Sequence, residues 1–189
     1  MRVIGTVGLP GSGKGELAEV ARDAGIPVVT MGDIIRQECR NRGLDPATDH
    51  GKIAKTLREE EGDDAIAARS LPVIEDHLES NDVVVVDGLR SGVELDRFRE
   101  AFGDEFVLVS VEAPFEMRAE RLGERGRDES DTDVESLKKR EQRELDFGMG
   151  EAMDRADIVI ENTGTLEEYQ ATITRLFEDG PAAVAGGDR

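Results

Sequence analysis

A glycine-rich loop near the N-terminus holds the residues best suited to chemistry. It lies between a β-type run and an amphipathic segment, and it reads Gly8-Leu9-Pro10-Gly11-Ser12-Gly13-Lys14-Gly15-Glu16. Glycines let the backbone curl so that successive N–H groups face inward, the following helix presents its positive end, and Lys14 reaches the outer phosphates as a point charge. We predict that residues 8–16 bind a polyphosphate and that Lys14 is catalytic. The alternative is a glycine-rich turn with an incidental lysine.

The residue after the lysine decides how a metal ion can be held. The usual loop has Ser or Thr there, whose hydroxyl binds Mg²⁺, but this chain has Gly15 followed by Glu16. The loop resembles that of adenylate kinases, which also have glycine at this place and hold the metal largely through water and the phosphates. The resemblance implies ATP and Mg²⁺ as cofactors. Two roles for Glu16 stay open: it binds a water of the magnesium ion, or it stabilises the helix start electrostatically.

An acidic residue follows the most hydrophobic run of the chain. Four valines, residues 83–86, lead into Asp87-Gly88-Leu89-Arg90, so a buried strand ends on a carboxylate. Doubly wound sheets bind ligands at that end of their strands. We predict that Asp87 is catalytic and binds Mg²⁺ through water, and that Arg90 offers a fork for a substrate phosphate. A simple Asp-Gly turn is the alternative. The stretch also resembles the Asp-Gly-Phe-Pro-Arg segment of adenylate kinases, with the arginine one residue closer.

The segment after the second predicted strand contains the other candidate substrate-binding residues. Thr30-Met31-Gly32-Asp33-Ile34-Ile35-Arg36 is similar to the Thr-Gly-Asp-Met-Leu-Arg segment with which adenylate kinases hold the acceptor nucleotide. That likeness implies that Arg36 binds the acceptor phosphate; a solvated helix arginine is the alternative. Asp33 could cap a helix that begins at Ile34. It could also be the base toward a hydroxyl acceptor, as in dephospho-coenzyme A kinases, whereas a phosphate acceptor is already ionised and needs none.

A charged stretch that is poor in apolar side chains, residues 123–133, predicts a solvent-exposed lid over the site, and a plain solvated loop is the alternative. The arginines in and beside it are Arg118, Arg121, Arg125 and Arg127. Arginines that close over a donor phosphate stabilise the transition state and exclude water. Arg121 and Arg125 match the lid-hinge arginines of adenylate kinases, and we predict that both are catalytic. Ion pairing with the neighbouring acidic residues is the alternative.

The last strand-like run carries a second resemblance. Residues 156–168 are similar to the closing strand and turn of dephospho-coenzyme A kinases, where the turn borders the donor adenine. Thr165 and Glu168 also have the spacing of a capping box, which gives this turn a purely structural explanation. His50 and His77 have no matching nucleophile or ligand set, and we assign them no catalytic role.

Alternating strand and helix patterns must position these residues. The β-branched runs are 2–7, 27–30, 82–86, 105–111 and 157–160. Such alternation predicts an α/β, three-layer P-loop NTPase fold, with a five-stranded parallel sheet and helices on both faces. Two helical patterns, 45–61 and 63–80, are longer than an ordinary crossover, so we interpret residues 31–80 as an acceptor-binding arm. We expect residues 1–179 to form one domain and residues 180–189 a flexible tail.

The amino-acid composition limits the classes of molecule that the protein can bind. The 189 residues include 43 acidic and 24 basic side chains, and the net charge of −19 repels the phosphate backbone of nucleic acid. Cys39 is the only cysteine, so neither an intramolecular disulfide nor a thiolate zinc cluster can form, and a cytoplasmic location follows most simply. No apolar stretch is long enough for a membrane span. We expect a small-molecule nucleotide acceptor, no nucleic acid and no membrane; a protein partner stays open.

The acidic excess is spread along the whole chain, which favours adaptation to a salt-rich cytoplasm. Salt screens the self-repulsion that otherwise destabilises a compact acidic protein. We therefore expect a higher unfolding midpoint in molar potassium chloride than at low ionic strength. Equal midpoints in the two solutions would contradict this interpretation.

The resemblances cover nearly all of the chain to Phe177. The loop and the acceptor segment are similar to adenylate kinases and the final strand to dephospho-coenzyme A kinases, so the chain resembles an archaeal P-loop nucleotide kinase family with both traits. This implies transfer of the γ-phosphoryl group of Mg-ATP to a nucleoside monophosphate such as AMP. The alternatives are transfer to a hydroxyl acceptor and an ATPase or nucleotide-gated regulator.

Overall fold

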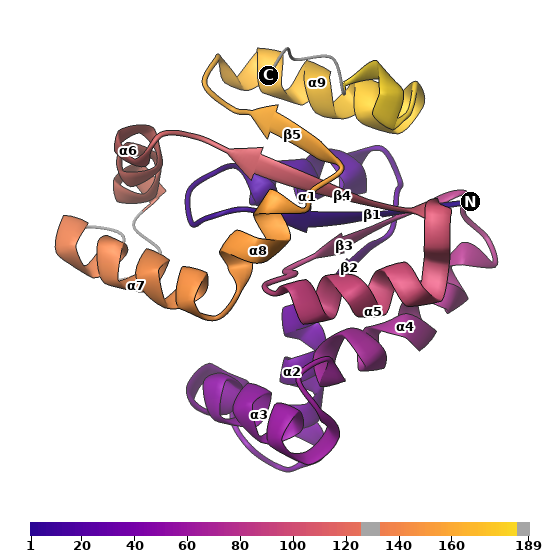
Figure 1. Ribbon diagram of the computed structural model, residues 1–189, viewed down its shortest axis with the longest axis vertical. Helices are drawn as coiled ribbons and strands as arrows, with labels where there is room; N and C mark the ends of the chain where they lie inside the picture. Colours follow the sequence, from indigo (N-terminus) through magenta and orange to yellow (C-terminus); the bar gives the residue numbers. More distant parts are fainter. Residues whose placement is uncertain (126–132, 185–189) are drawn as a thin grey trace.

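The computed structural model describes residues 1–125 and 133–184, and its centre is a five-stranded parallel sheet (Figure 1). The strands are β1 (Arg2–Val7), β2 (Val28–Thr30), β3 (Val83–Asp87), β4 (Phe106–Glu112) and β5 (Ile158–Glu161). Their order is β2-β3-β1-β4-β5, and every neighbouring pair is parallel. The predicted fold class is therefore confirmed. The bounds of β1 agree with the prediction, and those of the other strands differ from it by at most one residue at each end.

Helices cover both faces of this sheet. They are α1 (Lys14–Asp23), α2 (Met31–Asn41), α3 (Pro46–Glu61), α4 (Ala65–Leu78), α5 (Gly92–Phe102), α6 (Phe115–Arg125), α7 (Val134–Asp146), α8 (Met149–Asp154) and α9 (Leu166–Glu178), with short 3-10 helices at Gly103–Glu105 and Pro181–Ala183. Helices α1 and α9 lie together on one face, whereas α4, α5 and α8 lie on the other. The carboxyl ends of the strands point toward α6 and α7, so loops from several strands meet there (Figure 1).

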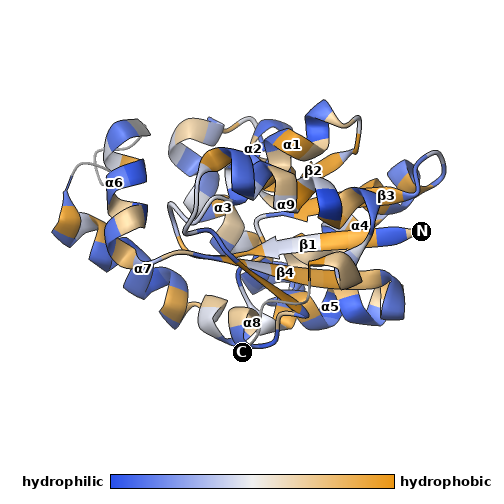
Figure 2. Ribbon diagram, turned by 90° about the horizontal axis from the view of Figure 1, so that it is seen from above, coloured by the Kyte–Doolittle hydropathy of each residue, from blue (hydrophilic) through white to orange (hydrophobic). Residues whose placement is uncertain are grey.

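Two apolar clusters form the core, one on each face of the sheet. Ile4, Val85 and Val109 pack with α1 and α9, whereas Val3, Val84 and Val86 pack with the helices of the other face. Successive side chains of a strand point to opposite faces, so an all-valine strand such as β3 supplies both clusters. Figure 2 shows hydrophobic colour on β4 and on part of β1, whereas the helices carry both hydrophobic and hydrophilic colour.

The residues interpreted as an arm comprise α2, α3 and α4. Helices α2 and α3 extend from the sheet (Figure 1), whereas α4 packs against β3. Strand β2 passes directly into α2, whose N-cap is Thr30, so Asp33 lies inside the first turn. The prediction that Asp33 caps a helix starting at Ile34 is therefore wrong, because the helix begins three residues earlier. The predicted capping box of Thr165 and Glu168 is confirmed at the start of α9.

The two segments with the weakest sequence patterns are only partly described. Most of the predicted lid, residues 126–132, lies outside the described residues, as does the side chain of Arg125 at the end of α6. Of the predicted tail, residues 185–189 lie outside the described residues. In residues 180–184, Val184 packs against the core and the Ala183 carbonyl accepts a hydrogen bond from Arg175. Among residues 1–125 and 133–184, no helix has the length and apolar character needed to cross a membrane.

Candidate functional site

The glycine-rich loop connects β1 to α1 at the carboxyl edge of the sheet. Gly13 has the left-handed φ of 117° and is the N-cap of α1. A Cβ atom there would lie 2.4 Å from Nδ2 of Asn162, so both the backbone shape and the space require glycine. The loop thus presents the N-terminus of a ten-residue helix to any anion above it, where the unpaired N–H groups favour negative charge.

Lys14 is the first residue of α1, and its ammonium group turns back over the loop. Nζ donates hydrogen bonds to the carbonyl oxygens of Gly8 and Leu9, the second at 3.4 Å. Burial of the ammonium group lowers the pKa of Lys14 from 10.5 to about 8, although the negative charge of Asp87 opposes this shift. A bound phosphate would therefore stabilise the charged form of Lys14.

This lowered pKa predicts a pH dependence for nucleotide binding. A bound phosphate favours the charged lysine, so above pH 8 the free protein must take up a proton when it binds. We expect ATP affinity to fall by about tenfold per pH unit above pH 8, measured by isothermal titration. Lys14→Arg keeps its charge over this range and should show no such fall. A wild-type affinity that stays constant from pH 8 to 10 would contradict the prediction.

Asp87 lies at the carboxyl end of β3, beside β1. Its Oδ1 accepts a hydrogen bond of 2.9 Å from the Thr6 hydroxyl, and Thr6 and Asp87 are register partners in the sheet. Gly15 offers no hydroxyl, and Glu16 faces α9, where it accepts a hydrogen bond of 2.6 Å from Gln170. A magnesium ion would be held here by Asp87, by water and by the phosphates of the nucleotide, a donor set that suits an ion which keeps much of its water. The described residues contain no cluster of three metal-binding side chains.

Six predicted site residues line a single cavity of about 290 Å³ between the loop and the arm: Gly8, Pro10, Lys14, Arg36, Asp87 and Arg90. The same cavity is also lined by ionisable residues outside the predicted site, namely His50, Arg58, Glu94, Arg140 and Glu144. The loop end of this cavity suits a donor phosphate, and the arginines at the arm end suit a second anion.

The arginines at the arm end pair with carboxylates that differ in burial. Arg36 contacts Asp33 at 2.7 Å, and 65% of the Asp33 side chain is exposed. Asp33 does not line the cavity, so its carboxylate lies away from any acceptor held there. Arg90 contacts Glu144 of α7 at 3.3 Å, and only 17% of the Glu144 side chain is exposed. A guanidinium group has five N–H donors, so each arginine can bind a second anion beside its carboxylate partner.

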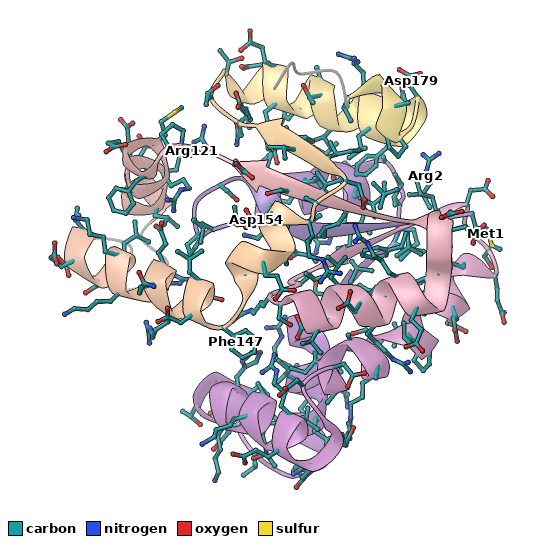
Figure 3. All side chains as sticks on the ribbon, viewed as in Figure 1. Met1, Arg2, Arg121, Phe147, Asp154 and Asp179 are labelled. Carbon is teal, nitrogen blue, oxygen red and sulfur yellow. The ribbon has the colours of Figure 1, made fainter. Side chains whose placement is uncertain are left out.

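A buried carboxylate fixes the arm to the rest of the domain. Glu94 accepts hydrogen bonds from the Arg90 backbone N–H at 2.8 Å and from the Arg58 guanidinium at 3.2 Å. Burial raises the pKa of Glu94, whereas these donors favour its charged form. Arg58 also lies 4.6 Å from the ring centre of Phe147, which Figure 3 labels at the junction of α7 and α8. Arg58 therefore connects the arm, the core and the helix that follows the predicted lid.

Two arginines of α6 contact the loop and the end of β5. Arg118 is only 4% exposed and donates to the Pro10 carbonyl at 3.1 Å and to Glu141 at 3.0 Å. Arg121, labelled in Figure 3, donates to the Asn162 carbonyl at 2.9 Å. The loop is thus supported from outside by α6, while the side chain of Arg125 lies outside the described residues.

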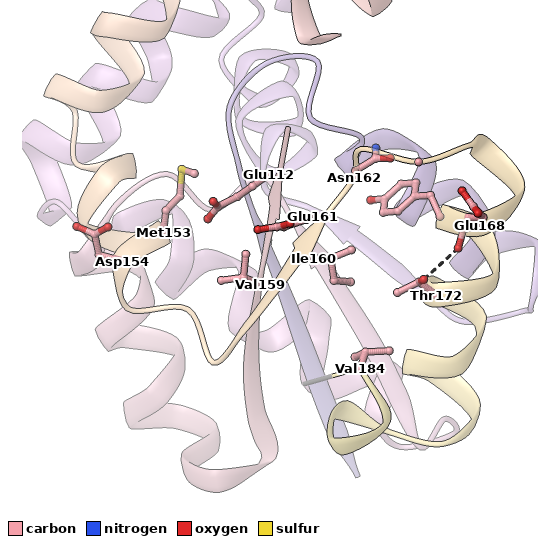
Figure 4. A pocket seen from close by; sticks show the side chains of 12 residues that line it. Glu112, Met153, Asp154, Val159, Ile160, Glu161, Asn162, Glu168, Thr172 and Val184 are labelled. Atoms are coloured by element: carbon pink, nitrogen blue, oxygen red, sulfur yellow. Dashed lines mark hydrogen bonds between the residues drawn. The ribbon is translucent and has the colours of Figure 1, made fainter. Parts of the chain in front are cut away.

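A second cavity of about 690 Å³ lies along the edge strand β5 (Figure 4). Carboxylates from four elements line it: Glu112, Asp154, Glu161 and Glu168. Neither Lys14 nor Asp87 takes part in it. Its acidic lining repels phosphate, so this cavity suits a phosphate group less well than the smaller cavity at the loop does.

Solved structures with similar folds include TT1252 from Thermus thermophilus, with a TM-score of 0.65 and 20% identity over 94% of this chain and 97% of that one. A shikimate kinase from Acinetobacter baumannii, in complex with shikimate, has a TM-score of 0.52 and 18% identity over 95% of this chain and 94% of that one. At such low identity these likenesses establish the fold, and the fold is that of P-loop kinases.

Comparison with related sequences identifies the family of this chain. Residues 7–138 match the AAA domain family. A UPF0200 protein of Halobacterium salinarum is 58% identical over 177 residues, which cover 94% of this chain and 93% of the relative. A UPF0200 protein of Methanosarcina barkeri is 42% identical over 95% of this chain and 96% of its own length, and a UPF0200/UPF0201 protein of Archaeoglobus fulgidus is 48% identical over 94% of this chain but only 55% of its own length. The chain therefore belongs to the archaeal UPF0200 family and carries a P-loop AAA domain.

Proposed function

We propose that this protein transfers the γ-phosphoryl group of Mg-ATP to a nucleoside monophosphate of the AMP type. The observation that carries the proposal is the single cavity in which Lys14 and Asp87 face Arg36 and Arg90. Lys14 and the loop suit the donor phosphates, and the two arginines suit the phosphate of an acceptor. Phosphoryl transfer needs these two groups close together and in line.

Positioning and charge account for the chemistry in this proposal. Lys14 neutralises charge on the donor phosphates, and Arg36 and Arg90 hold the acceptor so that one of its oxygens faces the γ-phosphorus atom. Mg²⁺, when bound, supplies further neutralisation between the transferring phosphates, and Asp87 would hold its water shell. The lid arginines Arg121 and Arg125 would add charge from above, as the resemblance to adenylate kinases implies.

The charge of the cavity favours a phosphate acceptor over a hydroxyl acceptor. Five cationic side chains line it against three carboxylates: Lys14, Arg36, Arg58, Arg90 and Arg140 against Asp87, Glu94 and Glu144. A phosphate monoester is ionised and needs no base, whereas a hydroxyl must lose a proton. Asp33, the candidate base, pairs with Arg36 and lies outside the cavity lining. Transfer to a hydroxyl, as in dephospho-coenzyme A kinases, is therefore the second candidate.

An acceptor panel tests the proposal. ADP release from Mg-ATP in molar potassium chloride is measured with AMP, CMP, UMP and dephospho-coenzyme A in separate reactions. We expect one nucleoside monophosphate to accelerate ADP release and to become phosphorylated. Slow hydrolysis that no acceptor changes would contradict the kinase and favour a regulatory ATPase, and phosphorylation of dephospho-coenzyme A alone would favour the hydroxyl acceptor.

Arg36→Ala shows whether the arm holds the acceptor. We expect the acceptor KM to rise by about tenfold or more, because a charged hydrogen bond contributes about 1.5–3 kcal/mol, while the KM for ATP stays the same. Arg40→Ala is the matched control, since Arg40 lies on the same helix, is exposed and contacts Gln37 at 3.5 Å. Equal acceptor KM values for the two variants would place the acceptor elsewhere.

A further inference from the structure

Two buried side chains hold the phosphate-binding loop from its outer side. Nδ2 of Asn162, at the end of β5, donates a hydrogen bond of 2.8 Å to the Ser12 carbonyl. The hydroxyl of Tyr169, on α9, donates one of 3.1 Å to the Gly13 carbonyl. The two residues are only 6% and 4% exposed, and neither lines the cavity that holds Lys14. Figure 4 shows Asn162 where β5 leads toward α9.

These bonds set the direction of the N–H groups that meet phosphate. In a trans peptide unit the carbonyl and the next N–H point in opposite directions, and the described residues contain no cis peptide bond. Fixing the Ser12 carbonyl outward therefore turns the Gly13 N–H inward, and fixing the Gly13 carbonyl does the same for the N–H of Lys14. We infer that Asn162 and Tyr169 are positioning residues for the phosphates of the nucleotide donor. The inference rests on the proposed function only in that the loop binds those phosphates.

The orientation of the Asn162 amide is fixed by its other neighbour. Arg121 of α6 donates to the Asn162 backbone carbonyl at 2.9 Å and lies 3.4 Å from Oδ1. Because Arg121 is only a donor, Oδ1 must face it, and Nδ2 is left to face Ser12. The Asn162 N–H in turn donates to the Glu112 carbonyl at 2.8 Å. Asn162 thus contacts both α6 and the loop.

Tyr169 contributes less than Asn162 to the orientation of the loop. The Gly13 carbonyl also accepts hydrogen bonds from the N–H groups of Glu16 and Leu17, at 3.0 and 3.2 Å, so the helix itself helps to orient it. Burial raises the pKa of Tyr169, which keeps the hydroxyl protonated and able to donate. Its ring packs in the core cluster of α1 and α9, so Tyr169→Phe removes the hydroxyl and keeps the packing.

The test is the affinity for Mg-ATP and for magnesium tripolyphosphate, measured by titration calorimetry in molar potassium chloride. Asn162→Leu keeps the size of the side chain and leaves the Ser12 carbonyl without its donor, so we expect both affinities to fall by the same factor, about 10- to 100-fold. For Tyr169→Phe we expect a fall of about 3- to 10-fold. Ser70→Ala is the control, because Ser70 is buried on α4 and its hydroxyl bonds only the Ile66 carbonyl at 2.8 Å in the described structure, so its removal should change neither affinity.

A purely structural role would lower the unfolding midpoint and leave the two affinities within twofold of the wild type, and that result would overturn the inference. A loss for Mg-ATP without a loss for tripolyphosphate would also overturn it, because the contact would then be with the nucleoside. If Asn162→Leu does not fold, Tyr169→Phe decides alone. Binding that responds as expected in a protein that phosphorylates no acceptor would leave the inference standing and refute only the kinase.

Discussion

Replacing Lys14 with alanine should lower kcat/KM for phosphoryl transfer by about 10³-fold, a loss of about 4 kcal/mol of transition-state stabilisation. Lys14 is the cation of the loop itself, and its buried ammonium group contacts loop carbonyls and lies in the field of Asp87. In the proposed reaction the transferring phosphates would lie beside this group, and no other lysine lines the cavity in the described structure. Steady-state kinetics with the acceptor identified by the panel measures the effect.

Lys52→Ala is the matched control for this variant, since Lys52 lies exposed on α3 and away from the cavity lining. We expect its kinetics to equal those of the wild type. Thermal unfolding of Lys14→Ala separates a local effect from loss of the fold. A folded Lys14→Ala variant with more than a tenth of the wild-type kcat/KM would exclude Lys14 from the reaction.

Asp87→Asn should lower kcat by about 10²- to 10³-fold and raise the magnesium concentration needed for half-maximal rate by about tenfold or more. The amide oxygen can still accept the Thr6 hydrogen bond, so the end of β3 keeps its shape and only the charge is lost. Loss of that charge weakens the hold on the water shell of the ion. A magnesium titration of the initial rate measures both quantities.

Asp82→Asn is the control for the charge change, because Asp82 precedes the opposite end of the same strand. It should leave both the rate and the magnesium dependence unchanged. If Asp87→Asn lowered the rate with an unchanged magnesium requirement, Asp87 would act on the phosphates or the acceptor and not on the metal.

Much of the fold could be predicted because its signals are local. The valine run of β3, the alternation of strands and helices and the capping box at Thr165 each depend on residues close in sequence. The error at Asp33 has a local cause as well. β2 has only three residues, and a strand that short gives no pattern to show that α2 begins at Met31.

The supporting residues of the site could not be predicted because their partners are distant in sequence. Asn162 is 150 residues from Ser12, and Tyr169 is 156 residues from Gly13. Tyr169 occupies a buried position of an amphipathic helix, where sequence alone indicates ordinary core packing. Arg58 and His50 likewise lie on α3, and only the fold of the arm brings them to the loop. The loop motif, in contrast, can be predicted from local sequence, because it requires glycine and lysine at fixed spacing.

The fate of the γ-phosphoryl group tests the central claim most directly. Protein in molar potassium chloride is mixed with γ-labelled Mg-ATP and the acceptor panel, and the labelled products are separated. We predict that the label appears on a nucleoside monophosphate, in an amount equal to the ADP formed, and that Lys14→Ala lowers this transfer by about 10³-fold. Label recovered only as inorganic phosphate with every acceptor would contradict the account.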